Sequence, residues 1–63
     1  MSEYLFTAYT YLDKEKEYAM LTFYKDKVKI INTDNQKIIK SISYKEFQKE
    51  FYANTFYDIE IEN

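Results

Sequence analysis

The sequence lacks several residue types on which common protein functions depend. Its 63 residues include no cysteine, histidine, glycine, proline, tryptophan or arginine. Without cysteine there can be no disulfide and no thiolate metal site, and the lack of histidine removes the other usual zinc ligand. The absence of glycine excludes glycine-rich phosphate-binding loops. We therefore expect no metal and no cofactor.

Catalysis is not expected either. Histidine is the usual general base near neutral pH, and cysteine is a strong nucleophile. The three serines, Ser2, Ser41 and Ser43, have no recognisable activating partner. A pair of carboxylates could still serve as acid and base, but a single small sheet rarely encloses a pocket that shifts their pKa values enough. The composition predicts a protein that is not an enzyme.

The abundant residues point to an AT-rich genome. Lys, Ile, Tyr, Phe and Asn, whose codons are rich in A and T, make up more than half of the chain. This bias indicates a low-GC bacterium or its phage. The net charge of −2 lacks the basic excess of a dedicated nucleic-acid-binding protein, so direct contact with nucleic acid is not expected. No apolar run could span a membrane and no signal peptide is recognisable, which predicts a cytoplasmic protein without membrane contact.

The length predicts a single small α+β domain over residues 1–63. A domain of this size buries only about 60% of the surface of its unfolded chain, so its stability is marginal. Eight tyrosines and five phenylalanines supply bulk for the core. Self-association is the other common way to complete a small core, and we expect a homodimer.

The N-terminal part of the chain predicts a β-hairpin. Residues 4–12 and 18–24 are dense in aromatic and β-branched residues, which favours two strands joined by the charged segment 13–17. Because side chains alternate along a strand, one group of residues would share a face of the first strand: Tyr4, Phe6, Ala8, Thr10 and Leu12.

Three further strands follow the hairpin. Residues 27–31 alternate lysine with Val and Ile, which predicts a half-buried strand with its lysines in solvent. Residues 32–36 (NTDNQ) predict a turn in which Asn or Asp takes the left-handed position, and residues 37–42 a fourth strand. Residues 56–62 alternate again and form the last strand. The expected fold is an antiparallel β-meander of four strands, one helix and a final edge strand (β-β-β-β-α-β).

The helix has the clearest local signals. Ser43 and Glu46 form a capping-box pattern, with Ile42 and Phe47 placed as a hydrophobic staple. Asn54 is the expected C-cap, since glycine is absent. Three rings would lie on one helix face: Tyr44, Phe47 and Phe51.

The aromatic residues exceed what so small a core can bury. If Tyr4 and Phe6 face inward, Tyr9 and Tyr11 face outward. Tyrosine is common at protein interfaces because it supplies a large contact area with few rotors and a polar tip. These tyrosines are therefore candidates for binding a protein partner, either a different protein or a second copy of the chain.

The last strand carries acidic residues at every second position. Asp58, Glu60 and Glu62 would share one face at a spacing of about 6 to 7 Å, which is close to the phosphate spacing along one DNA strand. Such a row would imitate a phosphate backbone and bind a DNA-processing protein. The other interpretation is a solvated edge strand whose charges prevent unwanted pairing.

Three lysines give the opposite pattern. Lys25, Lys27 and Lys29 would contact phosphate if the chain bound nucleic acid after all. Alternatively, they would pair across strands with the acidic row, each pair contributing less than about 1 kcal/mol.

Residues 47–62 (FQKEFYANTFYDIEIE) resemble the C-terminal third of the small uracil-DNA glycosylase inhibitors of Bacillus phages. That family has a helix carrying a Phe and a Tyr, then an Asn-Thr pair and a final strand. The matching positions here are Phe47, Phe51 or Tyr52, Asn54 and Thr55. The resemblance implies a dimer that imitates DNA with acids and an aromatic pocket, and it adds Tyr52 to the partner-binding candidates.

These observations predict a small phage or mobile-element protein that binds and inhibits a host protein, such as a DNA-processing or defence enzyme. One alternative is a small nucleic-acid-binding module with a β-barrel-like fold, because five strands with a helix before the last also fit such folds. Another is a structural or assembly subunit without inhibitory activity.

Overall fold

The chain forms one antiparallel sheet with a helix between its last two strands. The computed structural model describes residues 3–12 and 17–62. The elements are β1 (Tyr4–Leu12), β2 (Glu17–Tyr24), β3 (Val28–Asn32), β4 (Ile38–Ile42), α1 (Tyr44–Tyr52) and β5 (Phe56–Ile61). The predicted α+β fold and its order β-β-β-β-α-β are confirmed. The charged segment predicted to join the first two strands lies outside the described residues, except for Glu17 at the start of β2.

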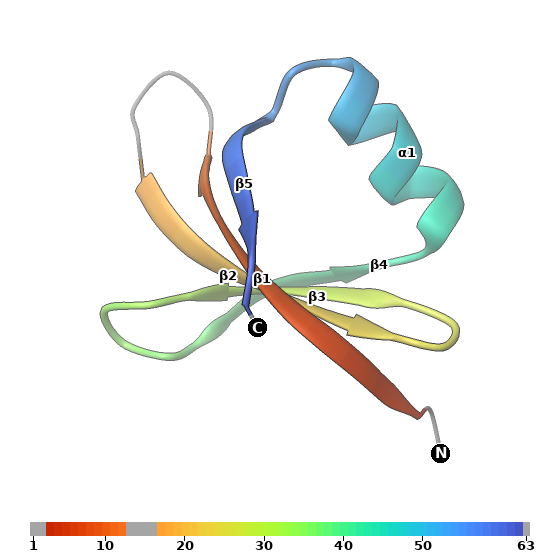
Figure 1. Ribbon diagram of the computed structural model, residues 1–63, viewed down its shortest axis with the longest axis horizontal. Coiled ribbons are helices and arrows are strands. Elements are labelled where there is room, and N and C mark those ends of the chain that lie inside the picture. Colours follow the sequence, from red (N-terminus) through yellow and green to blue (C-terminus); the bar gives the residue numbers. More distant parts are fainter. Residues whose placement is uncertain (1–2, 13–16, 63) are drawn as a thin grey trace.

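The strands lie in the order β4-β3-β2-β1-β5. The first four strands therefore form a meander, and α1 carries the chain from one edge of the sheet to the other, where β5 pairs with β1 (Figure 1). The sheet is strongly twisted, as expected for strands of L-residues.

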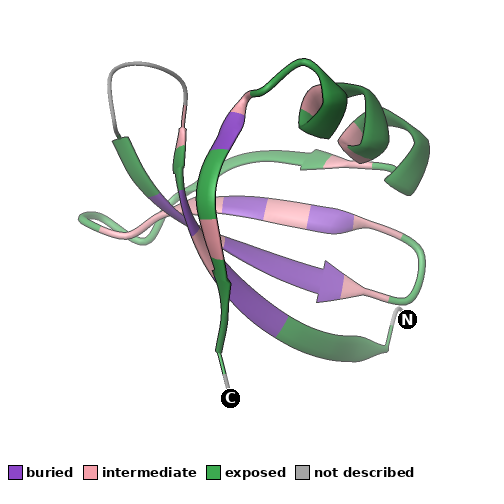
Figure 2. Cartoon of the chain, turned by 45° about the horizontal axis from the view of Figure 1, so that its top comes forward, coloured by how far each residue is buried: buried purple, intermediate pink, exposed green. Residues whose placement is uncertain are grey.

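The core lies on the face of the sheet that α1 packs against, which we call the inner face. Ala8 pairs with Leu21, and Leu21 pairs with Ile30, so these three side chains share that face and are buried. Figure 2 shows that the buried positions run across β1, β2 and β3 and reach the start of β5 at Phe56. The opposite, outer face carries the other alternate positions of the same strands.

A register shift in β1 overturns one part of the predicted pattern. Tyr4 lies opposite Tyr24 and Phe6 opposite Phe23, so β1 has one residue more than β2 between these pairs. Such a bulge moves Tyr4 to the outer face, where its hydroxyl lies 2.6 Å from that of Thr7. The prediction that Tyr4 shares a face with Phe6 is therefore wrong, because strict alternation does not hold across a bulge.

The helix begins at the predicted cap. The Oγ of Ser43 accepts a hydrogen bond from the backbone N–H of Glu46 at 3.2 Å. The N–H of Phe47 donates to the Ser43 carbonyl at 2.8 Å and closes the first turn. Ile42 and Phe47, the expected staple pair, both pack against the core. These contacts lie within a few residues of one another, which is why the local sequence predicts them.

The helix ends in a Schellman motif. The N–H of Thr55 donates to the Glu50 carbonyl at 3.1 Å, and that of Asn54 to the Phe51 carbonyl at 3.2 Å. Asn54 has a φ of 62°, in the left-handed region. The C-cap is Ala53, and Asn54 is the residue after it. The prediction that Asn54 is the C-cap is therefore wrong by one position. Asparagine takes the position that glycine usually occupies, because its short polar side chain tolerates this conformation.

Phe47 packs its ring between the helix and the sheet. The Phe47 ring lies 5.3 Å from that of Phe23 and 5.1 Å from that of Phe56, measured between centroids. The Tyr44 hydroxyl donates to a backbone carbonyl of β2. The helix has no fully buried residue, and Phe51 is 47% exposed. The helix face that carries the three predicted rings is therefore turned toward the sheet, but of these rings only Phe47 is packed from several sides.

The turn between β3 and β4 is built from asparagine side chains. Asn32 Oδ1 accepts hydrogen bonds from the N–H groups of Asp34 at 2.8 Å and Asn35 at 3.3 Å. Asn35 Oδ1 accepts from the N–H of Lys37 at 2.9 Å. The left-handed position belongs to Gln36, with a φ of 58°, and not to Asn or Asp as predicted. The asparagines instead satisfy the backbone N–H groups of the turn.

Candidate functional site

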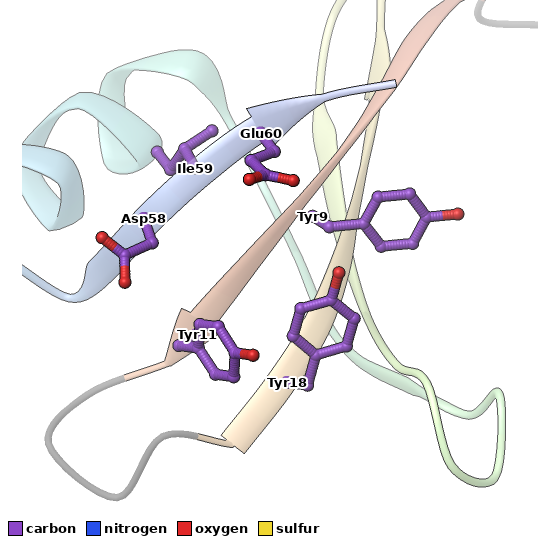
Figure 3. Close-up of a pocket in the computed structure, with 6 residues that line it drawn as sticks. All are labelled: Tyr9, Tyr11, Tyr18, Asp58, Ile59 and Glu60. Atoms are coloured by element: carbon purple, nitrogen blue, oxygen red, sulfur yellow. The ribbon is translucent and has the colours of Figure 1, made fainter. Parts of the chain in front are cut away.

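The outer face of the sheet has an open pocket near one end of the β1–β2 hairpin. Its volume is about 450 Å³. Tyrosines from β1 and β2 form one side of it, and residues of β5 form the other (Figure 3). We call it the tyrosine pocket, and its lining residues are Tyr9, Tyr11, Tyr18, Asp58, Ile59 and Glu60.

Antiparallel pairing brings the three rings together. Tyr11 lies directly opposite Tyr18. The Tyr9 and Tyr18 rings are nearly parallel, at 4° with centroids 5.8 Å apart, while the Tyr11 ring is tilted by 55° to Tyr18 at 4.9 Å. Tyr11 and Tyr18 are 38% and 41% exposed. Tyr9 and Tyr11 lie on the outer face of β1, as expected for an inward-facing Phe6, although the other condition of that prediction, an inward-facing Tyr4, does not hold.

A bulge in β5 sets the position of the acidic residues. Tyr57 pairs with Tyr11 and Glu60 with Tyr9, so β5 has one extra residue between these pairs. Asp58 lies at this bulge with a φ of 52°. The Thr10 hydroxyl, which is buried opposite the bulge, donates to the Tyr57 carbonyl at 2.8 Å and so supplies a partner where the ladder is interrupted.

The bulge corrects the predicted acidic row. Strict alternation would place Asp58, Glu60 and Glu62 at regular intervals on one face and Tyr57 on the other. Instead Tyr57 and Glu60 lie on the same outer face as their partners on β1. The regular two-residue spacing therefore holds only from Glu60 to Glu62.

The pocket is negatively charged. The Tyr9 hydroxyl donates to Glu62 Oε2 at 3.2 Å. This hydrogen bond raises the pKa of the Tyr9 phenol, and the negative charge of the same carboxylate adds to the shift. Asp58 and Glu60 have no cationic partner among the described residues.

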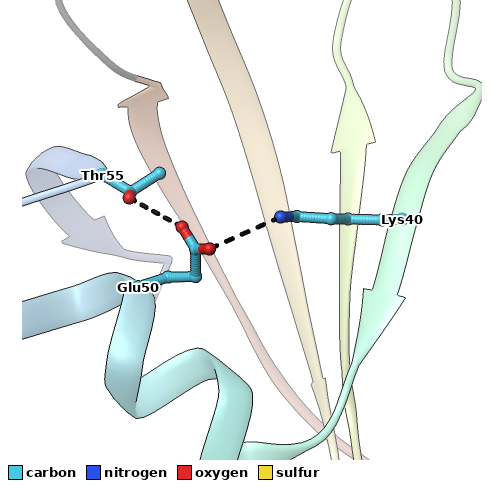
Figure 4. A network of polar contacts seen from close by, with 3 residues as sticks. All are labelled: Lys40, Glu50 and Thr55. Carbon is cyan, nitrogen blue, oxygen red and sulfur yellow. Dashed lines mark hydrogen bonds and ion pairs between the residues drawn. The ribbon is translucent and has the colours of Figure 1, made fainter. Parts of the chain in front are cut away.

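An ion pair lies elsewhere in the fold. Lys40 Nζ lies 3.8 Å from Glu50 Oε1, on the helix side of the sheet (Figure 4). The other oxygen of Glu50 accepts from the Thr55 hydroxyl at 2.7 Å. This network ties the end of α1 to β4 and takes no part in the tyrosine pocket.

Two other sets of predicted residues lie away from the pocket. Tyr52 is on α1, is 73% exposed, and borders a shallow groove of about 360 Å³ on the helix surface. Lys27 and Lys29 place their ammonium groups 5.7 Å and 4.9 Å from the centroid of the Tyr24 ring. Tyr24 is at the opposite end of β2 from Tyr18, about 20 Å along the strand.

The lysines do not pair with the acidic strand. Lys25 is exposed beyond the end of β2, and its N–H donates to the Glu3 carbonyl at 2.8 Å. In the sheet, β3 and β5 are separated by β2 and β1. The predicted cross-strand pairing of Lys25, Lys27 and Lys29 with the acidic row is therefore wrong.

Tyr18 and Ile59 are the pocket residues that the sequence did not predict, and Tyr18 is the one that adds a ring. The predicted β1–β2 hairpin was the signal that could have identified Tyr18. In an antiparallel hairpin the end of the first strand lies beside the start of the second, so aromatic residues at these two positions come together. The register that places Tyr18 opposite Tyr11 depends on the turn that joins the strands, and strand periodicity does not define that register.

Comparison with protein-family models, curated proteins and solved structures gave no significant match to this chain. The resemblance to the uracil-DNA glycosylase inhibitors stays a prediction from the sequence. In the part of the chain that the structure describes, no helix has the length and apolar character needed to cross a membrane. Within the same residues, no three or more acidic side chains converge as a metal site would require.

Proposed function

We propose that this chain is a non-enzymatic protein of a phage or mobile element that binds and inhibits a host DNA-processing or defence enzyme in the host cytoplasm. The observation that carries the proposal is the tyrosine pocket. It brings three tyrosine rings and two carboxylates together on the face of the sheet that is opposite the core.

The exposed rings support a protein partner. Tyr11 and Tyr18 are each more than one third exposed, although they could have been polar at no cost to the inner core. Tyrosine contributes a large contact area and loses little side-chain entropy on binding. Clustered rings of this kind are typical of the residues that dominate interface energies.

The charge of the pocket supports a basic partner. Asp58 and Glu60 have no cationic partner among residues 3–12 and 17–62, so a complementary surface would find both available. Enzymes that act on DNA carry basic surfaces because they neutralise phosphates. The mimicry part of the proposal depends on Glu60 and Glu62, which keep a spacing of about 6 to 7 Å.

A nuclease-treated pull-down from a low-GC Gram-positive lysate tests the proposal. The bait is the wild-type chain, the Glu60→Lys variant, or the Asp34→Lys variant, which makes the same charge change in the β3–β4 turn. We expect one stoichiometric host protein with the wild type and with Asp34→Lys, and much less with Glu60→Lys. Added wild-type chain should then reduce the activity of the captured enzyme.

Each other outcome removes a defined part of the proposal. Recovery of nucleic acid, or loss of every partner after nuclease treatment, would favour the nucleic-acid-binding alternative. Equal capture by Glu60→Lys would remove the pocket from the interface. Capture without any loss of enzyme activity would favour a structural or assembly subunit.

The proposal includes a homodimer formed through the helix surface. The shallow groove there is lined by Tyr44, Phe47, Gln48, Phe51 and Tyr52. A second copy would cover the half-exposed Phe51 and the largely exposed Tyr52, which a small core cannot bury. Sedimentation of the wild type and of Tyr52→Lys tests this point: the variant should be a monomer at concentrations where the wild type is a dimer.

A further inference from the structure

We propose that the tyrosine pocket binds an arginine side chain of the partner protein. This inference rests on the proposed function and names the group by which the partner is held. The first support is the arrangement of the rings. Tyr9 and Tyr18 are within 4° of parallel and Tyr11 is tilted by 55° to Tyr18, and the three rings line one side of an open volume of about 450 Å³. A cation within about 6 Å of a ring centroid is attracted to the face of the ring.

The second support is the pair of carboxylates on the β5 side. Figure 3 shows Glu60 on β5 across from the tyrosine rings of β1 and β2. Glu60 and Asp58 both line the pocket, and neither forms an ion pair within the described part of the chain. A guanidinium group can donate two parallel hydrogen bonds to a carboxylate while its plane rests against an aromatic ring. The pocket therefore offers both kinds of contact to one side chain.

The third support is a comparison within the same hairpin. At the far end of β2, the Tyr24 ring is already occupied by the chain's own cations, Lys27 at 5.7 Å and Lys29 at 4.9 Å. Tyr11 and Tyr18 have no such cation among the described residues. Within residues 3–12 and 17–62, the tyrosine pocket thus has the groups that attract a cation and no cation beside them.

Two observations favour arginine from a different protein. The ammonium group of lysine is compact and strongly hydrated, whereas guanidinium is planar, weakly hydrated and suited to stacking and bidentate pairing. The chain itself contains no arginine, so a second copy cannot supply this group. The occupant is therefore a heterologous protein, and the homodimer surface on the helix is separate from it.

The test is an NMR titration of the full chain with a blocked pentapeptide, Ala-Ala-Arg-Ala-Ala. Peptides with lysine or with uncharged citrulline in place of arginine are the comparisons, at constant ionic strength. We expect the arginine peptide to shift the signals of Tyr9, Tyr18 and Glu60, the lysine peptide to bind more weakly, and the citrulline peptide to leave them unchanged.

Substitutions locate the binding site. Tyr18→Ala should weaken binding of the arginine peptide by about 2- to 30-fold, the range that a cation–π contact covers. Glu60→Gln should weaken it as well, and it keeps the shape of the side chain if Tyr18→Ala does not fold. The matched controls are Tyr4→Ala, a 53% exposed tyrosine at the opposite end of β1 from Tyr11, and Asp34→Asn, a distant acid. Both should bind as the wild type does.

Some results would overturn the assignment. Equal or tighter binding of the lysine peptide would exclude arginine as the preferred group, and signal shifts confined to the helix or to the lysines would place the site elsewhere. If no peptide binds but a host enzyme is captured and inhibited, the arginine assignment fails and the inhibitor proposal stands. If the arginine peptide binds at the pocket but no host protein is captured, the arginine assignment stands and the inhibitor proposal fails.

Discussion

Replacing Phe47 by alanine should separate the helix from the sheet. The Phe47 ring contacts Phe23 and Phe56 at centroid distances of 5.3 and 5.1 Å, and Phe51 at 6.3 Å. No residue of α1 is fully buried. Besides Phe47, the helix is held by Tyr44, whose ring lies 6.5 Å from that of Phe23 and whose hydroxyl donates to a β2 carbonyl, and by the ion pair between Glu50 and Lys40. The matched variant is Phe51→Ala, which removes an equal side chain that is 47% exposed.

The magnitude follows from these contacts. Burying a whole phenylalanine contributes about 1.5 to 3 kcal/mol, and Phe47 is half-buried. Its two close ring pairs add about 0.5 to 1.5 kcal/mol each. We expect Phe47→Ala to lower the free energy of unfolding by about 2 to 4 kcal/mol, and Phe51→Ala by about 1 kcal/mol or less. A domain of this size has only about 3 to 9 kcal/mol in total.

Urea unfolding followed by circular dichroism measures the difference. With a slope near 1 kcal/mol/M for a small domain, Phe47→Ala should lower the midpoint by about 2 to 4 M. Phe47→Leu retains most of the apolar volume and should cost less than about 1.5 kcal/mol. The reasoning is refuted if Phe47→Ala and Phe51→Ala have the same midpoint, because the helix would then not be held by its central ring.

Other substitutions test the site and the helix ends. Glu62→Gln should lower the Tyr9 pKa toward its ordinary value, while Asp34→Asn leaves it unchanged, as followed by NMR of the ring carbons against pH. Because the Tyr9 pKa is higher in the folded than in the unfolded state, the Tyr9–Glu62 interaction stabilises the fold below about pH 10, and this contribution is lost as the pH rises further. Glu62→Gln should therefore reduce the loss of stability at high pH. Ser43→Ala should lower the free energy of unfolding by about 1 kcal/mol in urea, since the helix loses its cap. Asn54→Ala should cost about 1 kcal/mol, whereas Asn54→Gly should not destabilise, because only glycine takes a φ of 62° freely.

Local sequence signals predicted the elements well. The Ser43 cap and the alternation of Val28 and Ile30 each depend on residues a few positions apart. The strands therefore lie close to their predicted ranges, and their order along the chain is as expected. Interactions within one turn or one strand can be inferred from neighbouring residues in the sequence.

The site was only partly predictable, because its geometry depends on pairing between distant strands. Tyr9 and Tyr11 were predicted to face outward, but their neighbour Tyr18 depends on the hairpin register. The bulge at Asp58 is stabilised by Thr10 of β1, and nothing in the sequence around Asp58 indicates a break in alternation. Tyr52 was placed among the candidates through the resemblance alone, and it lies on another surface.

The pairing of β1 with β5 also has a consequence for folding. The hairpins of the meander join neighbouring strands, whereas Tyr9 and Glu62 are separated by 53 residues in the chain. Closing a loop of that length costs roughly 3 to 4 kcal/mol in chain entropy, so β5 is expected to dock after the meander has formed. The tyrosine pocket spans this junction and exists only once both ends of the chain have met. A partner bound there therefore stabilises the last folding step by mass action, and the chain should exchange its β5 amide protons more slowly when the pocket is occupied.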